Sequence, residues 1–222
     1  MFQVVGALED YTKEYKGASN FPVGTLTLVV GNNPIEMKAI GAAAHAVEAK
    51  IGEAPVGTII KVRGNLEYRT YNDMCFIDLN VGSLIVLGAA GQQDALFEVQ
   101  GFVGDVKELQ SRKGETFYRA NLKTIAFNRD DYVDGARVEL SLEDDDLSVW
   151  RDREGEMATV VGKISGYRNA EGRIYHSWRA STITYTRTPG YLASFVEGFE
   201  DPDLEDFIDD EDPTSTEAGF TF

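Results

Sequence analysis

Residues 61–69 read Lys61-Val62-Arg63-Gly64-Asn65-Leu66-Glu67-Tyr68-Arg69, and a similar pattern returns at residues 160–168 as Val160-Val161-Gly162-Lys163-Ile164-Ser165-Gly166-Tyr167-Arg168. The start of the chain is repeated in the same way: residues 2–6 read FQVVG and residues 97–101 read FEVQG. These stretches largely alternate apolar and polar side chains, which is typical of strands with one buried face. The sequence therefore predicts one strand-rich unit that is built twice.

The order of elements is the same in both passes. A strand leads into a polar loop, two further strands follow, and a long hairpin ends the unit. In the first pass, strands are expected at residues 2–10, 25–30, 35–40, 57–72 and 74–87, with an Ala-rich helix at 42–51. In the second pass, strands are expected at residues 97–101, 116–127, 138–142, 160–168 and 173–186. No convincing helix is predicted in the second pass, although Asp144 to Asp146 and Trp150 lie where one would be.

This order is that of the OB-fold, a five-stranded barrel. We predict an all-β protein with one short helix, made of two tandem OB-fold barrels at residues 1–90 and 95–188 and a disordered acidic C-terminal tail at 196–222. Each pass also has glycines inside its strands, which usually mark the bulges or bends that a small barrel needs at its corners. We assign these glycines to the fold: Gly6, Gly64, Gly101 and Gly162.

The acidity of the chain is concentrated at its C-terminal end. Residues 196–222 contain eleven of the 37 acidic residues and none of the 21 basic ones, in a chain of formal net charge −16. The first 195 residues therefore carry 26 acidic against 21 basic side chains, or −5. A run of like charges with few apolar residues cannot repay the cost of ordering itself. The body lacks the overall positive charge of a duplex-DNA binder, so any nucleic-acid site is expected to be a local basic stripe.

Cysteine usage and hydropathy set the expected compartment. Cys75 is the single cysteine, so no internal disulfide is expected and a reducing cytoplasm is the natural setting. No apolar run approaches the roughly 20 residues needed to span a bilayer, and no signal peptide is recognised at the N-terminus. We expect a cytoplasmic protein, in the host cytoplasm if the chain comes from a phage.

Residues 1–90 resemble the bacterial single-stranded DNA-binding protein family. Val5-Gly6-Ala7-Leu8 resembles the family's first strand, residues 61–71 resemble its fourth strand and the Arg- and Tyr-bearing hairpin, and residues 44–48 lie at the place of its helix. Bacterial and phage members also carry acidic tails that end in Phe, although here residues 213–219 separate the acidic run from Phe220. The resemblance implies a non-enzymatic protein that coats single-stranded DNA without sequence specificity in replication, recombination or repair, with no cofactor. It also implies recruitment of a polymerase, helicase or primase by the tail, and it is compatible with a homo-oligomer.

Sequence-tolerant binding of a single strand needs cations that follow the phosphates and flat rings on which bases stack. In an OB-fold, the loops between strands 1 and 2 and between strands 4 and 5 frame the groove. Tyr and Arg recur in both hairpins at places that look equivalent. The candidate single-stranded DNA-binding residues are Lys13, Tyr15, Lys16, Lys61, Arg63, Tyr68, Arg69, Tyr71, Arg112, Lys113, Tyr118, Arg119, Tyr167, Arg168, Arg173, Tyr175, Trp178 and Arg179. The candidate partner-binding residues of the tail are Asp209, Asp210, Glu211, Asp212, Phe220 and Phe222.

Two other functions remain open from the sequence. The first is a protein-interaction or assembly module with little DNA binding, which the charge of −5 favours. The second is a nuclease that uses Asp144 to Asp146 and a divalent metal, although a charged loop is the commoner reason for such a run. His45 and His176 lack ligand spacing, so no metal site is predicted. We also expect the tail to occupy a basic groove until a single strand displaces it.

Overall fold

The structure is a computed structural model, and it describes residues 1–71, 74–89, 91–110, 114, 116–124, 126–127, 132–133, 137–142 and 144–186. The predicted tail at 196–222 lies outside these residues. Residues 1–187 form one compact unit. Among the described residues, no helix is long and apolar enough to cross a membrane.

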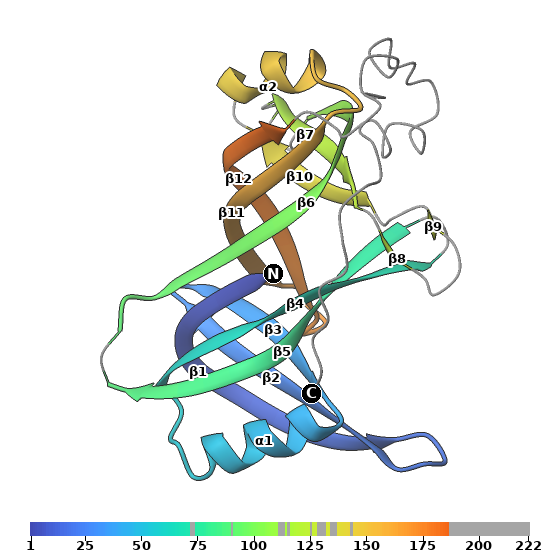
Figure 1. The fold of residues 1–222 in the computed structure, drawn as a ribbon. Coiled ribbons are helices and arrows are strands. Elements are labelled where there is room, and N and C mark those ends of the chain that lie inside the picture. The colour runs from blue at the N-terminus through green and yellow to red at the C-terminus, as the bar shows by residue number, and fades with distance from the viewer. Residues whose placement is uncertain are drawn as a thin grey trace, which may run out of the picture. The chain divides into compact units, whose positions relative to one another are not determined.

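The first pass of the sequence folds into a closed five-stranded barrel, which we call barrel 1 (Figure 1). Around the barrel the strands follow the order β1, β2, β3, β5, β4 and back to β1, the order of an OB-fold. Its elements are β1 (Phe2–Lys16), β2 (Phe21–Val30), β3 (Asn33–Ile40), α1 (Ala42–Ile51), β4 (Ile59–Tyr71) and β5 (Met74–Gly88). The alternation of the sequence is kept in space: Val62, between Lys61 and Arg63, is fully buried, and Arg63 is exposed.

The second pass forms barrel 2 in the same order: β6, β7, β10, β12, β11 and back to β6. Its elements are β6 (Asp94–Gln110), β7 (Thr116–Lys123), β10 (Arg137–Leu142), α2 (Asp144–Arg151), β11 (Met157–Arg168) and β12 (Ile174–Thr186). A small hairpin of β8 (Ala126–Phe127) and β9 (Tyr132–Val133) lies between β7 and β10 in sequence. The prediction of an all-β, tandem OB-fold body is confirmed.

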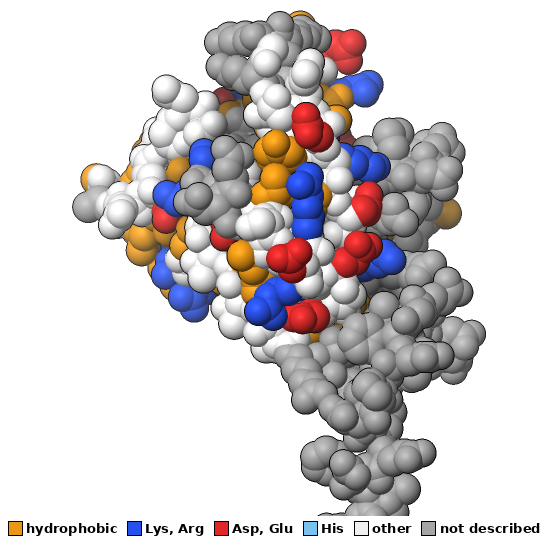
Figure 2. Space-filling model, turned by 90° about the horizontal axis from the view of Figure 1, so that it is seen from above, with side chains coloured by type: hydrophobic (Ala, Val, Ile, Leu, Met, Phe, Trp, Pro, Cys, Tyr) orange, Lys and Arg blue, Asp and Glu red, His pale blue; other side chains and the backbone are white. Residues whose placement is uncertain are grey.

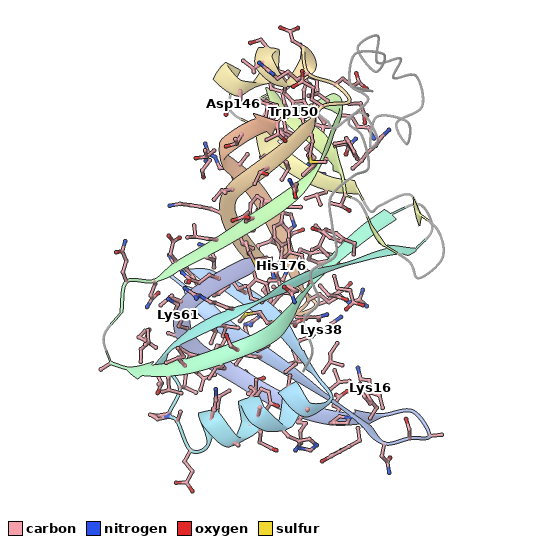
Figure 3. All side chains as sticks on the ribbon, in the orientation of Figure 1. Lys16, Lys38, Lys61, Asp146, Trp150 and His176 are labelled. Atoms are coloured by element: carbon pink, nitrogen blue, oxygen red, sulfur yellow. The ribbon has the colours of Figure 1, made fainter. Side chains whose placement is uncertain are left out.

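One expectation about barrel 2 is wrong: the sequence predicts no helix in the second pass, but residues 144–151 form helix α2. Acidic side chains in a first helical turn interact favourably with the helix dipole. Trp150 anchors the last turn: its side chain is fully buried, and its indole Nε1–H donates to the carbonyl of Gly104 at 2.9 Å. Figure 3 shows Trp150 beneath α2, far from the junction of the barrels. The helix therefore occupies the place that α1 has in barrel 1, and its apolar anchor decides its position.

The two barrels share one sheet, because β1 and β6 pair antiparallel. Phe2 lies directly opposite Phe97, and both rings are buried. These two residues hold the same place in the repeated FQVVG and FEVQG stretches, so the pairing relates the barrels by an approximate two-fold axis. A continuous run of strands, β5-β4-β1-β6-β11-β12, therefore crosses from one barrel to the other.

The strand glycines of the fourth strands make room for these rings. The pairing register shifts between Arg63 and Gly64 and between Val161 and Gly162, and the extra residue at each shift lies in the partner strand, Gly82 of β5 and Ser181 of β12. A Cβ added at Gly162 would lie 2.7 Å from the ring of Phe97, and a Cβ added at Gly64 would lie equally close to the ring of Phe2. The repeated sequence thus encodes a repeated packing motif.

Candidate nucleic-acid interface

A row of side chains crosses the outer face of the shared sheet. The pairing places Arg63 opposite Gln3, Gln3 opposite Leu96, and Leu96 opposite Lys163, and Lys163 in turn faces Arg179. Directly paired residues project from the same face of a sheet, about 5 Å apart. Arg63 also donates from Nε to Oε1 of Gln3 at 2.9 Å. The row therefore places cations from both barrels on one surface that spans their junction.

The hairpin of β11 and β12 extends this surface beyond the row. Along its outer face, the cross-strand pair Lys163 and Arg179 is followed by Ser165 and Ser177 and then by Tyr167 and Tyr175. The two tyrosine rings stack, with centroids 5.4 Å apart and planes 19° from parallel. They remain 60 % and 42 % exposed. Exposed, mutually stacked rings beside cations are the kind of surface on which bases of a single strand stack.

The inner face of the same hairpin packs against barrel 1. Gly166 contacts Pro34 so closely that a Cβ added to it would lie 1.8 Å from the carbonyl oxygen of Pro34. Arg168 binds Glu9 in a bidentate ion pair, with N–O distances of 2.6 and 3.1 Å. Arg168, a candidate DNA-binding residue, therefore joins the two barrels in this structure.

His176 lies between the barrels, as Figure 3 shows. The backbone N–H of Glu36 in β3 donates to Nε2 of His176 at 3.2 Å, and the imidazole lies edge-on to Trp178. Desolvation at this junction lowers the pKa of His176 from 6.5 to about 4, against the opposing field of Asp78. The imidazole must be neutral at Nε2 to accept the bond, so it contributes to the junction only in its uncharged form.

Acid should therefore weaken the folded state through His176. Because the folded-state pKa lies below the usual value of 6.5, the unfolded chain takes up the proton first as the pH falls. The free energy of unfolding should fall between pH 6.5 and 4 and level off below, by at most about 3 kcal/mol from this residue. The measurement is urea unfolding at several pH values on the native chain and on His176→Gln, whose amide oxygen accepts a bond without titrating. Equal pH dependence of the two chains in this window would contradict the assignment.

The end of the β1–β2 hairpin of barrel 1, residues 13–24, carries a second group of candidates, and we call it the β1–β2 arm. Tyr15 and Lys16 are exposed, and the ammonium of Lys13 lies 5.5 Å from the centroid of the Tyr15 ring. Lys13 is less available for binding a phosphate, because its ammonium is paired with Glu48. The hydrogen bond to Glu48 also raises the pKa of Lys13. Phe21, which is 45 % exposed beside this group, was missed in the sequence. Phe21 lies at the start of β2, directly opposite Lys16, and its place at the end of the polar loop could have marked it as a candidate.

The equivalent arm of barrel 2 is described only in part. Arg112 and Lys113 lie outside the described residues. Tyr118 is half-buried beneath the guanidinium of Arg151, which lies 5.9 Å from its ring centroid. Arg119 is exposed and lies over the ring of Phe117 at 5.8 Å. The hairpin residues Arg69 and Tyr71 lie in β4, but their side chains are likewise outside the described set.

Two candidates have to be corrected. Trp178 is only 7 % exposed and packs edge-on against Phe97 at 5.2 Å, so it belongs to the core of barrel 2 rather than to a stacking surface. Tyr68 packs against the core of barrel 1 and is partly buried. The repeated pattern matches Tyr68 with Tyr167, but Tyr68 follows Gly64 by four residues, whereas Tyr167 follows Gly162 by five. Because side chains alternate along a strand, this difference of one turns the two tyrosines to opposite faces.

The remaining candidates do not converge on one groove. Arg173 is exposed beside the turn of the β11–β12 hairpin, 3.8 Å from Glu171. Lys61 lies on β4, well apart from Lys16 on the arm (Figure 3). The residues therefore form two surfaces: the face of the shared sheet with its hairpin, and the β1–β2 arm of barrel 1.

Seen from above, at the α2 end, acidic and basic side chains are interspersed (Figure 2). Neither sign dominates among the residues coloured there, so this end is a poor surface for a polyanion.

The acidic start of α2 does not form a metal site in the part of the chain that the structure describes. No group of three or more His, Cys, Asp or Glu side chains is placed there to hold a metal ion.

Comparison with known proteins supports the fold. Neither a protein-family model nor a curated protein matches the sequence. Among solved structures, the wild-type single-stranded DNA binding protein from Thermus aquaticus superposes with a TM-score of 0.59 at 17 % identity, over 85 % of this chain and 93 % of that chain. A deletion mutant of the same protein gives the same TM-score at 15 % identity, over 85 % and 94 % of the two chains. The chain thus shares the fold of that protein over 85 % of its own length.

Proposed function

We propose that this protein binds single-stranded DNA without sequence specificity and has no enzymatic activity. The observation that carries the proposal is the pair of closed OB-fold barrels joined through β1 and β6, the fold shared with a single-stranded DNA-binding protein. A fold hosts many functions, so the argument also needs side chains of suitable chemistry on its surface. The exposed rings of Tyr15, Phe21, Tyr167 and Tyr175 supply flat surfaces for bases.

The charge distribution also fits binding by local contacts. The net charge of −5 on residues 1–195 argues against a broad electrostatic attraction to DNA. Arg63, Lys163 and Arg179 nevertheless lie in one row on the shared sheet. Affinity should therefore depend more on stacking than it does in strongly basic binders.

We further propose that residues 196–222 act as a recruiting arm in phage or bacterial replication, recombination or repair, in the cytoplasm. The eleven acidic residues would meet a basic patch on a polymerase, helicase or primase, and Phe220 or Phe222 would enter an apolar pocket. The same charges would compete with DNA for the basic surface of the body, and salt would screen this competition.

The test is fluorescence anisotropy of a labelled oligo-dT titrated with the full chain at several salt concentrations. An external label is needed, because Trp150 and Trp178 are both buried and would report stacking poorly. The logarithm of the affinity should fall linearly with the logarithm of salt, by roughly 0.7 for each phosphate neutralised. A chain that ends at residue 195 should bind at least as tightly at low salt, and the difference should shrink as salt rises. Absence of binding at low salt by both chains would reject the proposal.

The runner-up function is a protein-interaction or assembly module with little DNA binding. It is favoured by the negative charge of the body and by the fact that Arg168 and Lys13 are both engaged by carboxylates. The same titration separates the two, since this function predicts no salt-dependent binding of oligo-dT.

A further inference from the structure

OB-folds bind their ligands on the face of the second and third strands, between the loop that joins strands 1 and 2 and the loop that joins strands 4 and 5. In barrel 1 this is the outer face of β2 and β3, where the pairing places Thr27 opposite Glu36 and Val29 opposite Pro34. Ile35, between Pro34 and Glu36, points inward and is fully buried. A single strand that barrel 1 binds is therefore expected on this outer face.

The β11–β12 hairpin of barrel 2 reaches one end of this face. Residues 166–168 line a groove of about 540 Å³ together with Glu9, Val29 and residues 31–34. Within this lining, Arg168 donates to both carboxylate oxygens of Glu9, at 2.6 and 3.1 Å. Arg168 is therefore a cation beside the ligand-binding face of barrel 1 that is already bound to a carboxylate.

Further carboxylates act on Arg168. The hydrogen bond and the charge of Glu9 raise the pKa of Arg168, and the fields of Glu36 and Asp10 add to this effect. Together these four groups carry a net negative charge, which repels phosphates. The backbone of a single strand therefore meets an unfavourable site at this end of the face for as long as Arg168 stays on Glu9.

The ion pair can break without movement of the hairpin. The side chains of Arg168 and Glu9 are 42 % and 31 % exposed, and exposed pairs contribute little to stability and are screened by salt. The hairpin has other contacts with barrel 1, because Gly166 packs closely on β3 and His176 accepts a hydrogen bond from the backbone of β3. Exposed side chains change rotamer on picosecond to nanosecond timescales. Arg168 can therefore turn from one partner to another while the barrels stay joined.

A phosphate group matches a carboxylate as a bidentate partner of arginine. We propose that Glu9 is an intramolecular competitor of DNA, which holds Arg168 in the free protein and yields it to a backbone phosphate when a single strand binds barrel 1. The inference rests on the proposed function and deepens it, because it names how the site is regulated. The pair of Lys13 with Glu48 is less suited to such an exchange, since the side chain of Lys13 is only 14 % exposed.

The test is the affinity for a labelled oligo-dT, measured by fluorescence anisotropy at low salt on the full chain and its variants. Glu9→Gln removes the competing charge and should bind about twofold to fivefold more tightly, the factor that corresponds to an exposed ion pair. The gain should disappear when Arg168→Gln is added to Glu9→Gln, because the partner of the phosphate is then lost. Arg168→Gln by itself should bind only slightly less tightly than the native chain, since Glu9 already engages Arg168.

Two control variants separate this competition from a general effect of charge. Asp10→Asn removes a neighbouring carboxylate that acts on Arg168 through its field, and Glu154→Gln removes one from an exposed position in the turn after α2. Each control raises the net charge by one, as Glu9→Gln does, and each should bind less tightly than Glu9→Gln. If Glu9→Gln gains no more than either control, or if its gain persists undiminished with Arg168→Gln, the inference is overturned while the proposed function stands.

A structure of the native chain with oligo-dT gives a direct readout. Arg168 should donate to a phosphate and no longer to Glu9, and an Arg168 that stays on Glu9 with DNA bound to barrel 1 overturns the inference. NMR titration of His176 checks the hairpin, since the pKa of His176 should remain near 4 in Glu9→Gln. A rise toward 6.5 would show that the ion pair holds the hairpin itself, which also overturns the exchange. If neither the native chain nor Glu9→Gln binds oligo-dT, the proposed function fails, and the inference fails with it.

Discussion

Replacing Phe97 by Ala should lower the free energy of unfolding by about 3–5 kcal/mol, the usual cost of removing a buried aromatic ring. The ring is 1 % exposed, packs edge-on against Trp178 and fills the space beside Gly162. It also faces Phe2 across the strand pair that joins the barrels. Its loss therefore leaves a cavity in barrel 2 and removes half of the contact on the approximate two-fold axis.

Chemical denaturation followed by circular dichroism measures this loss. The matched control is Phe21→Ala, which removes the same side chain from a position that is 45 % exposed and should cost less than about 1 kcal/mol. A loss for Phe97→Ala as small as that of the control would show that the ring is not a central packing element. Phe97→Leu should fall between, because it keeps part of the buried volume.

Replacing Gly166 by Val should separate the β11–β12 hairpin from barrel 1. The new Cβ would lie 1.8 Å from the carbonyl oxygen of Pro34, and backbone cannot yield as a flexible side chain can. The hairpin must move away, so the bond from Glu36 to His176 and the pair of Arg168 with Glu9 should weaken together. We expect a loss of about 2–4 kcal/mol, in the upper range for overpacking.

The same variant should change the ionisation of His176. Once the hairpin moves, the imidazole regains solvent, and its pKa should rise from about 4 toward 6.5, which NMR titration of the ring protons measures. The matched control is Gly82→Ala, also in a strand, where an added Cβ meets nothing closer than 3.5 Å and should be tolerated. If the pKa of His176 stayed at about 4 in Gly166→Val, the contact between the β11–β12 hairpin and barrel 1 would be refuted.

Much of the fold could be predicted because it is written in local patterns. The alternation around Val62 and Val160 and the strand glycines occur in both passes. The strand order repeats as well, so a barrel could be predicted without knowledge of the contacts between distant residues. Helix α2 could not be predicted in this way. Its acidic, weakly apolar sequence resembles a solvated loop, and burial of Trp150 is what fixes it as a helix.

The candidate site was predicted less well, for a reason that Tyr68, Tyr167 and Trp178 make clear. All three are aromatic residues in the strands of a terminal hairpin, so composition treats them alike. A shift of one position along a strand decides whether such a ring points into the core or into solvent, and composition alone does not reveal that position. Tyr167 lies outside, and Tyr68 and Trp178 lie against the core.

Two copies of a five-stranded barrel could be predicted from the sequence, because side-chain periodicity and strand order are local properties. The segregation of acidic charge into residues 196–222 is likewise visible in the sequence. The pairing of β1 with β6, and the contact of the barrel 2 hairpin with β3 of barrel 1, became visible in the three-dimensional structure alone. Such pairings join residues about a hundred positions or more apart. They depend on which strand edges and side chains meet in space, information that no local pattern holds.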